Sequence, residues 1–157
     1  MPDVVGAEDL VVGTVVDLGS YTVTRAEILA FAAHWDPQAI HLDDDYAAGH
    51  EFGEIIASGV HTLGVYQRLA VLGAYRRWPI IAGRAIRDVQ LTYAVRAGAT
   101  LRGEVEIAAV HLTDEARALV TTYGRLFVGD RPALRLTTDA YLRRRPRDDG
   151  RAGRGTE

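Results

Sequence analysis

Asp36 and His41 stand five positions apart in segment 34–43, HWDPQAIHLD, and are the first candidates for chemistry in this sequence. A carboxylate can accept a proton from water, and an imidazole can donate or accept one near neutral pH. The segment follows a helical pattern that ends at Asp36-Pro37, because the residue before a proline is disfavoured in a helix. A loop placed there can direct both side chains into one cleft. The same spacing is also typical of a local hydrogen bond that only stiffens a loop.

Segment 55–62, IIASGVHT, offers a second chemical group, the free N–H donors at the start of a helix. Ser58 is the expected N-cap, which leaves unpaired backbone N–H groups near Gly59. Glycine lets a ligand approach the backbone closely, and a carbonyl oxygen there would meet both donors and the positive helix end. The alternative is a plain helix start. Together, the two segments supply an acid–base pair and an oxyanion-type donor, which suits chemistry beside a thioester carbonyl.

The elements before these segments must bring them together. Residues 11–23 are rich in valine and threonine and predict an edge strand or hairpin. Thr24 and Glu27 then match a capping box, so a helix is expected to begin there. Residues 36–58 read as a long loop, and loops of that length in a compact domain are usually functional.

The elements after the loop predict the fold. Residues 59–76 are apolar over most of a helical circumference, which favours a buried helix. Beyond Trp78, apolar and polar residues alternate in four segments joined by short turns, the pattern of an antiparallel sheet. We therefore expect an α+β fold in which the sheet curls around one apolar helix.

Composition bounds the class of protein. The 157 residues suit one domain, expected over residues 1–142, followed by a disordered arginine-rich tail over 143–157. The absence of cysteine excludes disulfide scaffolds, thiolate zinc sites and cysteine nucleophiles. A net charge of −3 argues against nonspecific nucleic-acid binding. No membrane span and no basic leader are seen, so a cytoplasmic protein is expected, and no cofactor is predicted.

Segment 31–62 resembles the MaoC-like dehydratases, the family of (R)-specific enoyl-CoA hydratases with the hotdog fold. Their motif has the form Asp-x-Asn-Pro-(aliphatic)-His, and Asp36 and His41 fall on its aspartate and histidine. Gly59 falls on the glycine whose N–H is taken to bind the thioester oxygen. Residues 87–101 are similar to the family's second strand and turn. The sequence departs from the motif at Gln38 and Ala39, which stand for its asparagine and proline.

The resemblance implies a five-stranded antiparallel sheet wrapped around a central buried helix, and usually a dimer of like chains or of related hotdog chains. It implies reversible addition of water to a trans-2-enoyl-CoA, giving a (3R)-3-hydroxyacyl-CoA. The substrate would be an acyl thioester of coenzyme A or of acyl carrier protein. Asp36 is the expected general base, while His41 orients the water and shares the proton movements.

Further residues are weaker candidates. Ser58 and His61 are expected near the substrate, although a capping or supporting role suits His61 better. Arg84 and Arg87 are candidates for the phosphates of coenzyme A, because arginine pairs well with phosphate. No metal site is expected, since the spacing of the histidines matches no helical ligand pair. A hotdog acyl-CoA thioesterase and a noncatalytic acyl-binding subunit of a hotdog heterodimer remain as alternatives.

Overall fold

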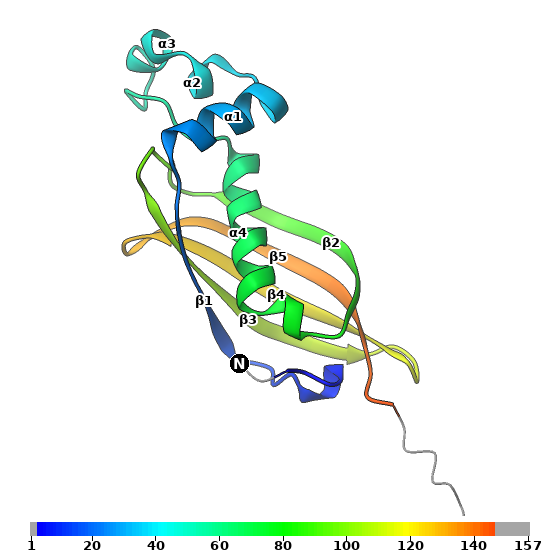
Figure 1. The fold of residues 1–157 in the computed structure, drawn as a ribbon. Coiled ribbons are helices and arrows are strands. Elements are labelled where there is room, and N and C mark those ends of the chain that lie inside the picture. The colour runs from blue at the N-terminus through cyan, green and yellow to red at the C-terminus, as the bar shows by residue number, and fades with distance from the viewer. Residues whose placement is uncertain (1–2, 147–157) are drawn as a thin grey trace, which may run out of the picture.

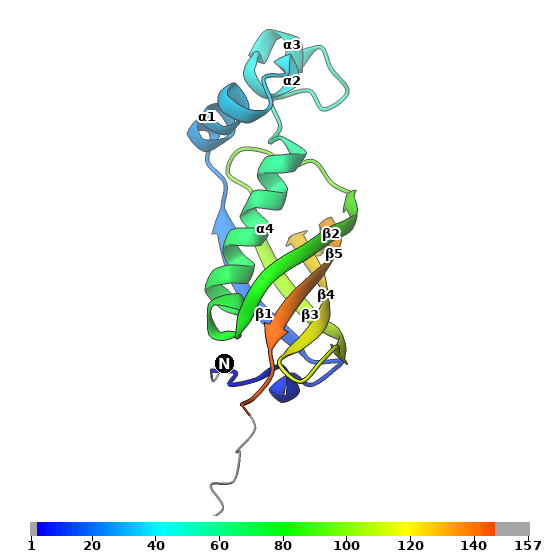
Figure 2. The ribbon, with the colours of Figure 1, turned by 90° about the vertical axis from the view of Figure 1, so that its right-hand side faces the viewer.

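The computed structural model describes residues 3–146, which form one five-stranded sheet, a long helix on one of its faces and a cap of short helices (Figures 1 and 2). The helices are η1 (Ala7–Asp9), α1 (Arg25–Trp35), α2 (Ala39–Leu42), α3 (Asp44–Ala48), α4 (Gly59–Gly73) and η2 (Tyr75–Arg77). The strands are β1 (Val15–Thr22), β2 (Ile80–Leu91), β3 (Thr100–Leu112), β4 (Arg117–Val128) and β5 (Arg131–Arg143). The expected α+β fold is confirmed. No helix within residues 3–146 is long and apolar enough to cross a membrane.

The strand order in the sheet is β1-β3-β4-β5-β2, and every neighbouring pair is antiparallel. Strands β3, β4 and β5 follow one another through short turns and form the centre. In the turn between β4 and β5, Gly129 has a φ of 57°, a conformation that favours glycine. Strands β1 and β2 therefore lie at the two edges, although the helices separate them in sequence.

Helix α4 packs one face against the concave side of the sheet. Its buried residues are Thr62, Val65, Tyr66, Leu69 and Ala70. Tyr66 lies directly over Gly124 of β4, where any side chain would collide with the tyrosine ring. Glycine at this position is what lets Tyr66, the largest fully buried side chain, reach the sheet.

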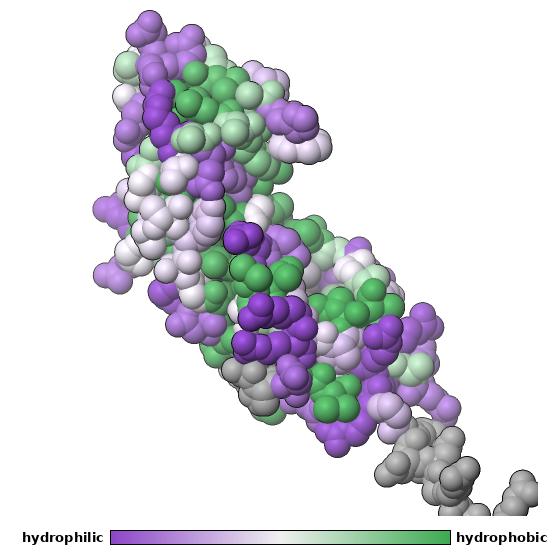
Figure 3. Space-filling model, in the orientation of Figure 1, coloured by the Kyte–Doolittle hydropathy of each residue, from purple (hydrophilic) through white to green (hydrophobic). Residues whose placement is uncertain are grey.

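The opposite face of α4 is open, which corrects the expectation of a helix buried all round. Val60 is 59% exposed, and Leu72 is 42% exposed. On the face seen in Figure 3, hydrophobic surface reaches the exterior at the centre of the molecule, where Figure 1 shows α4. The helix also ends at Gly73 rather than at residue 76. The apolar pattern was correct, but the sheet covers only one side of the helix.

The cap at one end of α4 consists of α1, α2 and α3 (Figure 1). The capping box that begins α1 is present, because Thr24 Oγ1 accepts from the Glu27 N–H and the Glu27 carboxylate accepts from the Thr24 N–H. Segment 36–58 is not a plain loop, since it contains α2 and α3. Asp43 starts α3 by accepting from the Tyr46 N–H at 3.0 Å.

The described structure continues past residue 142, the expected end of the domain. Arg143 is the last residue of β5. Arg144 donates to Glu8 at 2.8 Å and its backbone N–H donates to the carbonyl of Ala116. The remainder of the expected tail, residues 147–157, lies outside the described residues.

Candidate active site

Asp36, His41 and Ser58 meet where the cap joins the start of α4. Asp36 is the residue at which α1 ends, His41 lies on α2, and Ser58 is the N-cap of α4. Ser58 Oγ donates to Asp36 Oδ2 at 2.6 Å, and His41 Nε2 lies 3.4 Å from the same oxygen. The structure thus brings together three of the residues that the sequence singled out, from three different elements.

His41 has a defined orientation. Its side chain is 8% exposed, and Nδ1 lies 2.7 Å from the backbone carbonyl oxygen of Ile56. A carbonyl oxygen can only accept, so Nδ1 carries a proton. The other nitrogen, Nε2, faces the carboxylate of Asp36.

Asp36 is held at both carboxylate oxygens. Gln38 Nε2 donates to Oδ1 at 2.7 Å, while Ser58 donates to Oδ2. The hydrogen bond from Ser58, and then that from Gln38, stabilise the ionised carboxylate and lower the pKa of Asp36 below its usual value. Partial burial opposes this shift, and His41 adds to it. Sequence reasoning noted Gln38 only as a departure from a motif and did not assign it this contact.

Gly59 begins α4 beside the pair. Ser58 Oγ accepts from the Val60 N–H at 3.2 Å, and the Ser58 carbonyl accepts from the Thr62 N–H at 3.0 Å. No acceptor within residues 3–146 takes the Gly59 N–H. This donor points out from the positive end of a 15-residue helix, where an oxyanion would be stabilised. A side chain at position 59 would collide with Leu91 at the end of β2.

His61 lies on the other side of the helix start. Its ring stacks on Phe31 with centroids 4.7 Å apart and an interplanar angle of 10°. Burial lowers the pKa of His61, against a smaller opposing effect of Glu27. The structure does not join His61 to Asp36 and His41 by any contact among the described residues. Its place between α4 and α1 is that of a packing residue beside the site.

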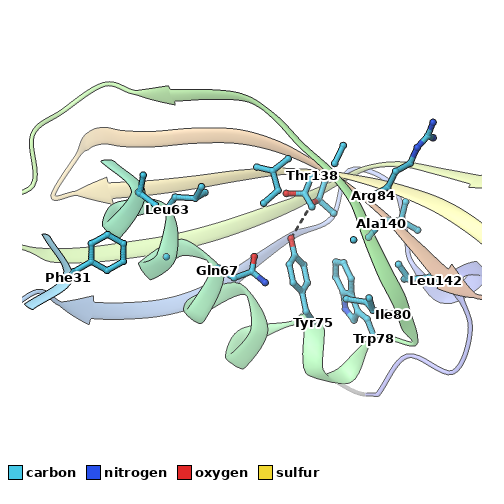
Figure 4. A pocket seen from close by; sticks show the side chains of 17 residues that line it. Phe31, Leu63, Gln67, Tyr75, Trp78, Ile80, Arg84, Thr138, Ala140 and Leu142 are labelled. Atoms are coloured by element: carbon cyan, nitrogen blue, oxygen red, sulfur yellow. Dashed lines mark hydrogen bonds between the residues drawn. The ribbon is translucent and has the colours of Figure 1, made fainter. Parts of the chain in front are cut away.

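A cavity of about 650 Å³ runs between α4, β2 and the concave face of the sheet. Phe31 and Leu63 lie toward one end of it, and Trp78 and Leu142 toward the other (Figure 4). Val60, the residue after Gly59, also lines the cavity, so one end opens close to the free N–H. Most of the lining is apolar. The cavity was not predicted, because its walls come from segments far apart in the sequence.

The two arginine candidates differ in their surroundings. Arg84 lines the cavity and lies over the ring of Tyr141, 5.9 Å from its centroid. Arg87 is already paired, since it donates to Asp139 at 2.8 Å and to Asp88 at 3.1 Å. These carboxylates would compete with a phosphate for Arg87. Within the described residues, no group of three or more His, Asp or Glu side chains is placed to hold a metal ion.

The sequence matches the family model described as the MaoC like domain over residues 9–126, and the chain belongs to this family of dehydratases and hydratases. The fold and the site agree with that assignment. The solved MaoC-like dehydratase from Rhodospirillum rubrum is 31% identical, with a TM-score of 0.81, covering 90% of this chain and 99% of that one.

Two other relatives extend the comparison. The solved (R)-hydratase from A. caviae involved in PHA biosynthesis is 26% identical, with a TM-score of 0.70, covering 86% of this chain and 98% of that one. YdeM, an uncharacterized protein of Bacillus subtilis, is 34% identical over 76 residues, or 48% of this chain. The match spans about half, 54%, of the length of YdeM.

Proposed function

We propose that the protein is an acyl-thioester hydratase that adds water reversibly to a trans-2-enoyl-CoA and forms a (3R)-3-hydroxyacyl-CoA. The observation that carries this proposal is the Asp36/His41 pair beside the start of α4, where the Gly59 N–H has no acceptor within residues 3–146 and the next residue, Val60, lines an apolar cavity. Hydration of a conjugated thioester needs a held water, a proton acceptor and a donor at the carbonyl oxygen. The site offers the proton acceptor and the donor near space for an acyl chain, and the water is proposed to lie between Asp36 and His41.

In the proposed reaction, the thioester carbonyl accepts a hydrogen bond from the Gly59 N–H. This contact withdraws electrons from the conjugated double bond and stabilises the enolate that follows attack. Asp36 and His41 hold one water, and the pair takes a proton from it as its oxygen bonds to C3. The pair then delivers that proton to C2, which restores the thioester and returns the pair to its starting state. Dehydration is the same path in reverse.

The acyl chain is proposed to enter the cavity between α4 and β2, with its thioester end at Gly59. Pockets of 300–1,000 Å³ with mostly apolar walls are typical of small-molecule sites, and this cavity is within that range. The carrier, coenzyme A or acyl carrier protein, would remain outside. Neither arginine candidate lies at that end: Arg84 is on the side of Ala140 and Leu142, away from Phe31 and Leu63 (Figure 4), and Arg87 is paired with Asp88 and Asp139.

Strand β2 is proposed to pair with a second copy of the chain or with a related hotdog chain. It lies at the edge of the sheet, and among the described strands it pairs with β5 alone. It exposes four large apolar side chains, namely Ile81, Ile86, Val89 and Leu91. An exposed, long and apolar edge strand is otherwise an aggregation hazard, so a partner strand is the expected cover.

The test is a panel of trans-2-enoyl-CoA substrates of increasing chain length, assayed with the wild type, Asp36→Asn and a control. Loss of the conjugated enoyl absorbance reports hydration, and release of free thiol is followed in parallel. Asp36→Asn should lower kcat by roughly a hundredfold or more, because it removes an acid–base group. Asp45→Asn makes the same chemical change at an exposed carboxylate in the same cap and should leave kcat unchanged.

The panel separates the alternatives. Thiol release without loss of the enoyl group would assign a thioesterase instead. Silence in both assays across the panel would favour a noncatalytic acyl-binding subunit. Undiminished hydration by Asp36→Asn would refute the role given to the pair. The melting temperature of each variant, compared with wild type, shows whether a lost activity reflects a lost fold.

A further inference from the structure

The side chain of Gln38 points toward Asp36 and not toward the helix that Gln38 begins. Gln38 is the N-cap residue of α2, yet its side chain does not cap that helix. Instead, the amide turns back and donates to Asp36 Oδ1 at 2.7 Å. The backbone supports this arrangement, since the Gln38 N–H donates to the Asp36 carbonyl at 2.8 Å and the His41 N–H donates to the Gln38 carbonyl at 3.0 Å. Gln38 thus contacts both members of the pair through its backbone, and one of them through its side chain.

The side-chain bond has a geometric consequence for the carboxylate. Oδ2 of Asp36 accepts a hydrogen bond from the Ser58 hydroxyl and faces His41 Nε2. Among the described residues, only Gln38 donates to Oδ1 on the other side. With both oxygens held, the carboxylate cannot turn about its terminal torsion, which is otherwise broad. The donor is a neutral amide, so it orients the charge without cancelling its attraction for His41.

Helix capping and packing do not explain where the Gln38 amide points. The family motif that this segment resembles has asparagine here, which is one methylene shorter and is among the preferred N-cap residues. Gln38 is exposed, and no partner other than Asp36 is bonded to its amide within residues 3–146. Packing therefore does not explain its orientation, whereas the carboxylate does.

We propose that Gln38 is a positioning residue of the catalytic pair, whose amide holds Oδ1 of Asp36 so that Oδ2 stays directed at His41 and Ser58. The expected effect on turnover rests on the proposed function, whereas the expected effect on the Asp36 carboxyl group does not. A charge-assisted hydrogen bond of this kind is among the stronger ones in proteins. Its loss should therefore appear in the turnover step and in the titration of the carboxyl group.

The first test compares Gln38→Met with Gln38→Asn in the full chain. Methionine keeps the length of the side chain and removes the donor, whereas asparagine keeps an amide. Gln38→Met should lower kcat on the best enoyl-CoA about tenfold, the effect of losing one such bond, with KM within about twofold. Gln38→Asn should recover most of that loss. Asp45→Asn, an exposed change in the same cap, serves as the unaltered control.

The second test needs no enzymatic activity. The ¹³C carboxyl signal of Asp36, assigned by its absence from Asp36→Asn, is titrated in wild type, Gln38→Met and Gln38→Asn. Because the amide stabilises the ionised form, the pKa of Asp36 should rise in Gln38→Met and return toward the wild-type value in Gln38→Asn. The melting temperature should stay close to that of wild type, since Gln38 is exposed.

The outcomes separate the two proposals. Equal kcat and an equal Asp36 titration in wild type and Gln38→Met would overturn the positioning role. Equal losses in the methionine and asparagine variants would also overturn it, because the amide would then not be the cause. A wild type inactive on every enoyl thioester would refute the proposed function alone, and the carboxyl titration would still decide the role of Gln38.

Discussion

The two edge strands of the sheet, β1 and β2, differ in length, in apolar exposure and in what lies against them. β1 has eight residues and β2 has twelve. β1 contains a bulge between Asp17 and Gly19, and Leu18 there is buried against α4. Almost every residue of β2 is exposed, although its inner neighbour β5 is largely buried.

The difference shows which edge strand is protected from further strand pairing by the chain itself. A short strand with a bulge is a poor template for pairing, and α4 also lies close to β1. A Cβ at Gly73 would lie 2.8 Å from Leu18 Cα, so helix and strand are in backbone contact. β2 also has bulges, at the three register shifts of its pairing with β5, but it is four residues longer than β1 and largely exposed. The side of α4 that faces β2 borders a cavity. The unprotected edge, β2, therefore lies on the side of the molecule where the substrate is proposed to bind.

The largest expected effect comes from a charge on the open edge. Val89 on β2 is 42% exposed, and Val89→Glu would bury an unpaired carboxylate if β2 pairs with another chain. Such a charge costs several kcal/mol, so the dimer should weaken by about a hundredfold or more. Light scattering after gel filtration should show the wild type at twice the 17.1 kDa of the chain and the variant at that mass.

Val15→Glu is the matched control on β1, where the valine is 51% exposed. The same charge should leave the mass of the wild type unchanged, because the β1 edge is not proposed to pair. A dimer that survives Val89→Glu, or one that dissociates equally in both variants, would contradict the contrast between the edges.

A smaller effect distinguishes the two sides of α4 through two of its glycines. Gly73→Ala would press against the backbone of Leu18 and should destabilise the fold by about 1–3 kcal/mol. Gly64 lines the cavity, and a Cβ there meets nothing within 4 Å. Gly64→Ala should therefore stabilise the fold by up to about 1 kcal/mol, the difference in helix propensity. Urea unfolding measures both, and changes of the same sign would refute the asymmetry.

The sequence predicted the parts of the site that are local. Asp36, His41, Ser58 and Gly59 lie within 24 residues of one another and were identified from two short segments. The helix start and the order of elements were predicted equally well, because capping and alternation are local signals. Whether the pair performs the proposed chemistry remains a prediction.

What the sequence could not show depends on contacts between distant segments. The cavity joins Leu63 of α4 to Leu142 of β5, and no periodicity reveals such a meeting. Helices α2 and α3 have four and five residues, too few for an apolar period to appear. The apolar circumference of α4 indicated burial, but the pattern cannot tell cover by its own sheet from cover by a ligand or a second chain.

The smallest expected effect concerns an ion pair next to η1, the short helix that precedes β1. Glu8 accepts from Arg144, and this bond is the main cause that lowers the pKa of Glu8 to about 2. A lowered pKa means that the pair stabilises the fold above the ordinary carboxyl value of 4.5 and loses that effect as the pH falls toward 2. Because both side chains are partly exposed, Glu8→Gln should cost no more than about 1 kcal/mol at neutral pH.

Thermal unfolding of wild type and Glu8→Gln at steps from pH 7 to pH 2.5 checks this expectation, with ~1 M salt as a second condition. The gap in melting temperature should be widest above pH 5, should narrow below the ordinary carboxyl value of 4.5, and should shrink in high salt. A gap independent of pH would mean that Glu8 acts through packing. If Glu8→Gln destabilised the fold as much as Gly73→Ala does, the ion pairs near η1 would contribute as much to stability as the contact between α4 and β1. That contact would then not be the main reason why the β1 edge is protected.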